Sequence, residues 1–172
     1  MKNVKSISNG GAHTLALKED GTIVSWGDNK FGQCNVPAGL KNIKEAAAEE
    51  IHSVAVKEDG TVIAWGDNIY NQCYVNEMTG VKAIDAGYHS TLVLNEDGTL
   101  NSSGEFFYNT QDIKDAVWIS SGYDRCVVVK ADGTMEIFYG PYALEPVFGE
   151  FIDIKTASAG LAHIVVLKMT VL

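Results

Sequence analysis

Short apolar stretches alternate with polar turns along this chain, and the turns recur at regular intervals. Asp-Gly pairs stand at positions 20–21, 59–60, 97–98 and 132–133, roughly 38 residues apart. An apolar stretch precedes each of them, as in Leu15-Ala16-Leu17 and Val127-Val128-Val129. Because Asp-Gly between two apolar runs favours a tight β-hairpin, the pattern predicts a tandem array of hairpin units.

A second sequence feature recurs with the same spacing as the Asp-Gly pairs. Seven residues before each Asp-Gly pair lies a fixed position, and a glycine stands three residues before most of these positions, with Glu49 as the exception. A fifth copy of the position follows near the end of the chain, without its turn. The fixed positions are occupied by His13, His52, Ser90, Arg125 and His163.

One unit predicts four short strands: residues 4–9, 13–18, 22–26 and a piece around 33–36 that Pro37 ends. The second strand is apolar on both faces, as expected where sheets stack on both sides. We therefore expect an all-β fold, a β-propeller of four-stranded antiparallel blades with about 4.5 repeats of ~38 residues. Residues 1–172 form one domain, with repeats at 4–39, 40–78, 79–114, 115–150 and a partial 151–172. Residues 45–50 have helix propensity, but the repeat register predicts a strand there.

Two units carry a longer shared motif. The motif begins in the first unit as Gly10-x-x-His13-Thr-x-Ala-Leu. It ends there as Asp20-Gly-Thr-x-x-x-Trp26-Gly-Asp-Asn-x-x-Gly-Gln33, and residues 52–72 repeat it in the second unit. Both resemble the regulator of chromosome condensation repeat, most closely its compact bacterial form. Units three and four keep the turn, with Ser103 and Phe138 in place of the tryptophan. The resemblance implies a β-propeller that serves as an interaction scaffold. It does not extend to nucleotide exchange or chromatin binding, which need a seven-bladed ring, a wedge hairpin and basic contact residues.

Composition narrows the range of partners. The chain has 172 residues, 46% of them hydrophobic, and a net charge of −9. An acidic chain without clustered Lys and Arg is not suited to nucleic acid or an anionic membrane. No signal sequence and no long apolar run is visible, so we expect a cytoplasmic protein. We expect Cys34, Cys73 and Cys126 to be reduced and structural, in keeping with that location.

No catalytic motif accompanies the repeats. The histidines of the fixed position occur on different blades, where they favour hydrogen bonds to the neighbouring blade over convergence on a metal. The sequence contains no nucleophile motif and no phosphate-binding loop, and no pair of acidic residues stands apart from the repeat as a general acid and base. We therefore expect a non-enzymatic protein with no cofactor and no metal, although the sequence leaves open a hydrolase or lyase in a central channel.

Two kinds of candidate site remain. Aromatic residues gather after the third strands of units three and four, where they form a protein-partner patch or replace the missing tryptophans in the core. The alternative is a small-ligand or carbohydrate site at the recurring Asp-Asn pairs. The partner-binding candidates are Phe106, Phe107, Tyr108, Tyr139 and Tyr142, and the ligand-binding candidates are Asp28, Asn29, Asp67 and Asn68.

The end of the array raises the question of how the ring closes. Residues 163–172 form an apolar strand after which no further repeat follows. Exposed strand edges are normally paired or covered. We expect a homodimer through this edge strand, and the alternative is a monomeric ring with a thin fifth blade.

Overall fold

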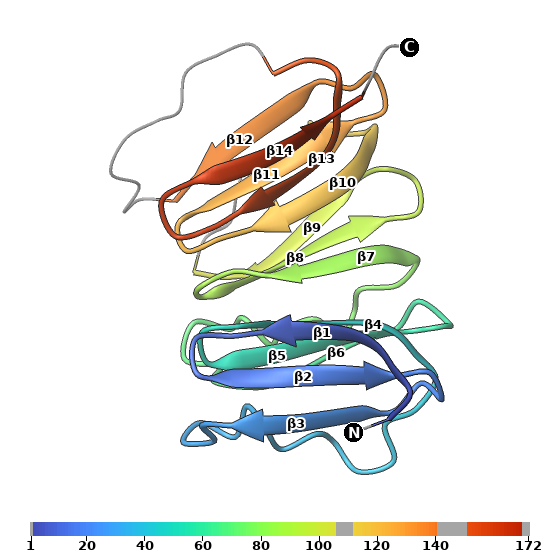
Figure 1. Cartoon of the computed structure of the whole chain (residues 1–172), viewed down its shortest axis with the longest axis vertical. Coiled ribbons are helices and arrows are strands. Elements are labelled where there is room, and N and C mark those ends of the chain that lie inside the picture. The colour runs from blue at the N-terminus through green and yellow to red at the C-terminus, as the bar shows by residue number, and fades with distance from the viewer. Residues whose placement is uncertain (1, 106–111, 141–150, 170–172) are drawn as a thin grey trace.

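The computed structural model describes residues 2–105, 112–140 and 151–169, and within these ranges it contains strands and turns but no helix. Five antiparallel sheets follow one another in chain order, as Figure 1 shows. We call them blades one to five. Blade one is β1 (Val4–Asn9), β2 (His13–Lys18) and β3 (Ile23–Gly27); blade two is β4 (Ile43–Glu49), β5 (His52–Lys57) and β6 (Val62–Gly66); blade three is β7 (Val81–Ala86), β8 (Ser90–Asn95) and β9 (Leu100–Gly104); blade four is β10 (Ala116–Ser121), β11 (Arg125–Lys130) and β12 (Met135–Tyr139); blade five is β13 (Ile154–Ala159) and β14 (Ile164–Lys168).

The Asp-Gly pairs form the turns between second and third strands, as the sequence predicts. In blade one Gly21 has a φ of 75°, a value that an L side chain rarely adopts. Asp20 Oδ1 accepts a hydrogen bond of 3.0 Å from the backbone N–H of Thr22. The same aspartate-to-threonine bond closes the turns at Asp59, Asp97 and Asp132.

The first segment of blade two is a β-strand, as the repeat register predicts, and not the helix that its residue propensities favour. Residues 43–49 form β4, which pairs with β5 in antiparallel register from Ile43↔Lys57 to Glu49↔His52. Alanine and glutamate favour a helix in isolation. In this chain the ladder to β5 and the burial of Ala47 and Ala48 against neighbouring blades decide the conformation.

The prediction of four-stranded blades is wrong for the described residues: blades one to four have three strands each there, and blade five has two. Around Gln33 the backbone makes successive turns, with hydrogen bonds from Gly32 N to Asn29 O and from Asn35 N to Gly32 O. Asn29 Oδ1 also accepts a bond of 2.9 Å from the N–H of Cys34. The segment therefore satisfies its backbone donors within itself, and no ladder to β3 forms. Residues 67–80 repeat this arrangement in blade two.

Successive blades stack face to face, and the core lies between them. Leu15 and Leu17 of β2 pack with Ala48, Ala55 and Trp65 of the next blade. Both faces of the middle strands are buried, as the apolar pattern predicts. The pairs that hold the same place as Leu15 and Leu17 are Val54 and Val56, Leu92 and Leu94, and Val127 and Val129, each in the cluster shared with the following blade.

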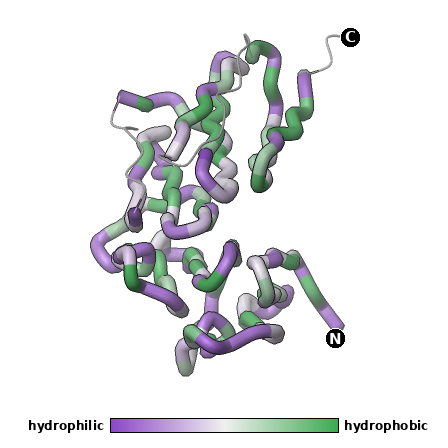
Figure 2. Tube along the Cα trace, turned by 90° about the vertical axis from the view of Figure 1, so that its left-hand side faces the viewer, coloured by the Kyte–Doolittle hydropathy of each residue, from purple (hydrophilic) through white to green (hydrophobic). Residues whose placement is uncertain are grey.

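The stack of blades curves into an arc. Blades one and five are the two ends of this arc, which opens on one side in Figure 2. Among the described residues there is no helix of the length and apolarity needed to cross a membrane.

Candidate functional site

The first strands of all five blades line a central cavity of about 310 Å³. Two carboxylates, Glu45 and Asp85, contribute to its wall. Along this wall, side chains of one blade bind backbone N–H groups of the next blade. These inter-blade hydrogen bonds join Ser8 Oγ to Ala48 N (2.9 Å), Glu45 Oε2 to Ile84 N (3.3 Å), Asp85 Oδ2 to Ser121 N (2.7 Å) and Ser120 Oγ to Ala159 N (3.2 Å).

Acidic residues of the first strands have raised pKa values. Burial raises the pKa of Asp85 to about 6, and the N–H groups of Ser121 and Ala86 partly offset the effect. Burial also raises the pKa of Glu49 to about 7, with further contributions from the charges of Asp85 and Glu50. No group of three or more His, Cys, Asp or Glu residues in the described ranges is arranged to hold a metal. The hydrogen bonds to the next blade give Glu45 and Asp85 a bracing role between blades.

Glu49 makes the stability of the fold depend on pH. Its folded pKa of about 7 lies above the ordinary glutamate value of 4.5, so folding favours the protonated carboxyl. This contribution to stability is complete below pH 4.5 and is lost as the pH rises through about 7. We expect Glu49→Gln to gain about 1–2 kcal/mol over the wild type between pH 5 and pH 8, a value discounted for partial exposure. Urea unfolding at both pH values measures this gain.

The control for this measurement is Glu58→Gln, at an exposed hairpin turn. Its free energy of unfolding relative to the wild type should not change between the two pH values. An equal gain in both variants would contradict the assignment of the pH dependence to Glu49.

The hairpins between first and second strands lie at one end of the blades, which we call the tip end. Tyr88 and Tyr123 occupy equivalent tips of blades three and four, and their ring centroids are 4.1 Å apart. Tyr88 also contacts His89 at 3.8 Å, and His89 contacts Tyr70 at 4.3 Å. These four residues form a continuous surface ladder, which we call the aromatic cluster.

Carboxylates surround the aromatic cluster. Burial lowers the pKa of His89, and the charges of Glu105, Asp67 and Glu50 oppose that shift. A side-chain hydrogen bond to Tyr123 raises the pKa of Tyr88. The tip end of blades two to four therefore combines partly exposed aromatic rings with negative charge, which is the chemistry that binds cationic side chains.

This cluster was not among the sites predicted from the sequence. Of the predicted aromatic patch, Phe106, Phe107, Tyr108 and Tyr142 lie outside the described residues. Tyr139 ends β12 at the tip end, with its ring centroid 5.9 Å from the guanidinium carbon of Arg125. A signal for the cluster was present in the sequence, because the position two residues before the fixed one is occupied by Gly11, Glu50, Tyr88, Tyr123 and Leu161 in the five units.

The Asp-Asn pairs organise the turn-rich loops. In blade two, Gln72 Nε2 donates to Asp67 Oδ2 at 2.7 Å, and Asn68 Oδ1 accepts from Cys73 N at 2.8 Å. Burial and the charge of Asp67 raise the pKa of the Cys73 thiol to about 12. The carboxylate and amide oxygens of the pair thus have partners inside the loop. Asp28 and Asn29 make the same bonds to Gln33 and Cys34. A ligand site at these pairs stays a prediction.

Two histidines of the fixed position, His13 and His52, bind the neighbouring blade, as their places in the repeat predict. His13 Nε2 lies 2.9 Å from Ser53 Oγ, and His52 Nε2 lies 3.1 Å from Thr91 Oγ1. Each hydroxyl in turn donates to a loop carbonyl of the preceding blade, that of Gln33 or Gln72. Burial, together with the nearby His13 and His89, lowers the pKa of His52 to about 3, so its ring stays neutral near pH 7.

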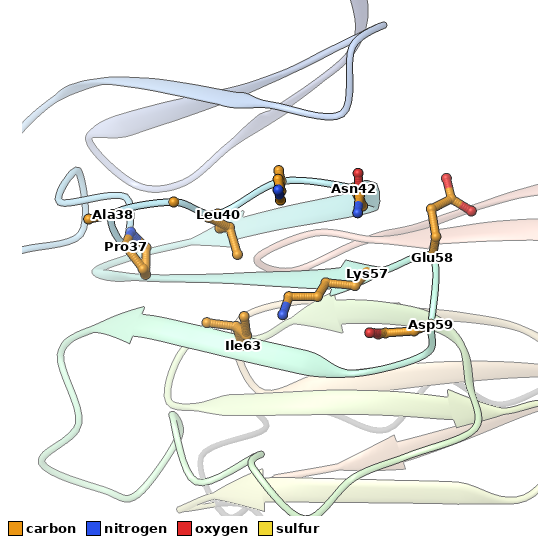
Figure 3. A pocket seen from close by; sticks show the side chains of 10 residues that line it. Pro37, Ala38, Leu40, Asn42, Lys57, Glu58, Asp59 and Ile63 are labelled. Carbon is orange, nitrogen blue, oxygen red and sulfur yellow. The ribbon is translucent and has the colours of Figure 1, made fainter.

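A separate hollow of about 380 Å³ lies at the rim of blade two, between loop 37–42 and the β5–β6 hairpin. Figure 3 shows Lys57, Asp59 and Ile63 along its wall. The Asp59 carboxylate is bonded to Thr61 in the hairpin turn. The hollow contains none of the candidate site residues predicted from the sequence, and its polar groups form no convergent set.

The stacked blades form the arc of a β-propeller, and known proteins resemble it in sequence and in fold. Residues 4–33 and 52–72 match the regulator of chromosome condensation (RCC1) repeat. Over 104 residues the chain is 28% identical to the guanine nucleotide exchange factor SRM1 of Saccharomyces cerevisiae, a match that covers 60% of this chain and 17% of that protein. Residues 4–33 and 52–72 are therefore RCC1-type repeats.

Solved structures agree on the fold. Prp20p of Saccharomyces cerevisiae, described with its binding to Gsp1p and histones, superposes with a TM-score of 0.79 at 20% identity, over 99% of this chain and 57% of that one. Human WBSCR16 superposes with a TM-score of 0.78 at 16% identity, over 96% of this chain and 59% of that one. This chain therefore spans less than two thirds of these relatives.

Proposed function

We propose that this chain is a non-enzymatic propeller scaffold that binds a protein partner through the tip end of blades two to four. The aromatic cluster is the observation that carries the proposal. Partly exposed aromatic rings on tight hairpins lose little conformational entropy on binding, and aromatic residues are enriched at protein interfaces. The loops of blades three and four that contain Phe106, Phe107, Tyr108 and Tyr142 are part of the proposal, as is a cytoplasmic location.

The chemistry around the cluster favours a basic partner. Glu50 and Glu105 act on the rings of the cluster, and the whole chain has a net charge of −9. Lys and Arg side chains would gain both ion pairing and cation–π contact there. The binding of Prp20p to Gsp1p and histones supports a protein as the class of partner.

Peptide binding tests this function. We expect a Lys- and Arg-rich peptide to bind the wild type, and a Glu-rich peptide of equal length not to bind. The double variant Tyr88→Ser/Tyr123→Ser should weaken binding at least ~10-fold, because two cation–π contacts of about 0.7 kcal/mol or more are lost. Fluorescence anisotropy at low salt measures the affinity.

The matched control is Phe31→Ser/Tyr74→Ser, which removes two exposed aromatic rings outside the cluster. Its affinity should equal that of the wild type, and circular dichroism checks that both double variants fold. If the cluster variant and the control bound the basic peptide as tightly as the wild type, the proposal would fail.

Association of two copies through residues 163–172, by strand edges or by side chains, also belongs to the proposal. The described part of that segment contains β14, which is the outer strand of its two-stranded sheet. The apolar side chains of β14 support a contact between copies, because Val165 and Leu167 are mostly exposed.

A further inference from the structure

Neighbouring blades contact each other through two faces, and blade five has the residues of one of these faces. The second-strand pairs Leu15 and Leu17, Val54 and Val56, Leu92 and Leu94, and Val127 and Val129 are at most 1% exposed, each beneath the following blade. In blade five the same places are occupied by Val165 and Leu167, which are 62% and 56% exposed. We call this the trailing face. It has the residues of a blade contact, but no blade formed by the described residues covers it.

Blade one has the residues of the other face. Trp65 of blade two is 8% exposed against blade one, and its indole N–H donates to Gln33 O at 2.9 Å. The equivalent Trp26 of blade one is 44% exposed. Beside it runs the cross-strand row Ile7↔Ala16↔Val24, in which Ile7 and Val24 are also exposed. We call this the leading face.

The polar groups of the blade contact are also retained at both ends. His163 holds the place of His13 and His52, which bind Ser53 and Thr91 of the following blade. The leading face has a hydroxyl, Thr14, at the place of those residues. His163 packs over Gly160 as His13 packs over Gly10, so the two rings take the same position.

The inner wall shows the same correspondence. Ser158 holds the place of Ser8 and Ser120, which accept N–H groups of Ala48 and Ala159 in the following blade. Asn9 holds the place of Ala48 and Ala159 on blade one. The two end faces therefore have complementary groups for all three kinds of contact: the apolar contact, the histidine–hydroxyl bond and the serine–backbone bond.

We propose that the trailing face of one copy packs on the leading face of a second copy, head to tail. The inter-blade contacts within the chain continue in this way across the boundary between molecules. Contiguous exposed apolar surface often marks a contact site, and both of these faces have apolar side chains exposed among the described residues. The contact is heterologous, because it joins two different surfaces. It rests on the repeat geometry alone and is independent of the proposed partner.

Sedimentation velocity with two complementary variants tests this proposal. Val165→Asp/Leu167→Asp disables the trailing face, and Val24→Asp/Trp26→Asp disables the leading face. We expect the wild type to form species larger than the 18.6 kDa monomer as its concentration rises. Each variant alone should remain a monomer. An equimolar mixture should form a dimer and nothing larger, because one intact face of each kind remains.

The outcomes separate head-to-tail contact from symmetric pairing of two β14 edges. In the symmetric case the leading-face variant would dimerise alone, and mixing would add nothing. Either that result or a monomeric wild type up to about 100 μM, a range in which interfaces of micromolar affinity assemble, would overturn the proposal. Thr14→Val gives a second readout, since loss of the histidine–hydroxyl bond should weaken association about 5-fold. Circular dichroism confirms the fold of each variant.

Discussion

Gly66→Ala is expected to destabilise the fold by about 3 kcal/mol or more, because it combines backbone strain with a close contact. Gly66 ends β6 with a φ of 106°, beyond the left-handed region that other residues occasionally adopt. A Cβ at this position would lie 2.8 Å from Ile51 O and 2.9 Å from His52 Cα. Both are backbone atoms of the adjacent strand and its hairpin, so neither can move without opening the β5–β6 ladder.

A second glycine separates backbone conformation from close contact. Gly80 also has a positive φ, of 66°, but no atom lies within 4 Å of where its Cβ would be. Gly80→Ala should therefore cost only about 1 kcal/mol, the strain of a left-handed residue. Urea unfolding followed by tryptophan fluorescence measures both variants. Equal costs would show that the contact at Ile51 is relieved without loss of the ladder.

Gln72→Leu is expected to cost about 3 kcal/mol, for a different reason. Gln72 is fully buried, its Oε1 accepts the N–H of Tyr70 at 3.0 Å, and its Nε2 donates to Asp67. Leucine fills a similar volume but leaves the N–H and a carboxylate that is only 5% exposed without these partners. A buried charge that loses its hydrogen bond costs more than a neutral group.

Blade one provides the matched control, since Gln33 makes the same two bonds to Phe31 and Asp28. Asp28 is exposed, so water can replace the lost amide there. We expect Gln33→Leu to cost about 1–2 kcal/mol, clearly less than Gln72→Leu. Chemical unfolding of the two variants side by side measures the difference, and the reverse order would contradict the role assigned to Asp67.

Much of the fold could be predicted because its signals are local. The Asp-Gly turn needs a glycine at positive φ and an aspartate that accepts the N–H of Thr22, and both requirements lie within three residues. The alternation of such turns with apolar stretches predicts the strands, and their repetition predicts stacked blades. Three of the four predicted strands per unit are confirmed in this way.

The absence of a fourth strand from blade one could not be predicted from the same signals. Gln33-Cys34-Asn35-Val36 has a composition compatible with a strand, yet Gln33 and Asn29 satisfy the backbone donors of this segment. A strand needs its partner in the ladder, and here side chains compete with that partner. The choice depends on distances between groups that the order of residues does not reveal.

The sequence by itself determined the repeat, the hairpins and the stacking of blades, because spacing and hydrophobic pattern act within one unit of the chain. Only the tertiary structure decided which aromatic residues share a surface. Tyr88 and Tyr123 belong to different blades and lie far apart in the chain, but their rings are 4.1 Å apart. Likewise, Val127 is buried and Val165 is exposed although they hold the same place in the repeat. The difference depends on what packs against each blade, which is a property of neighbours in space.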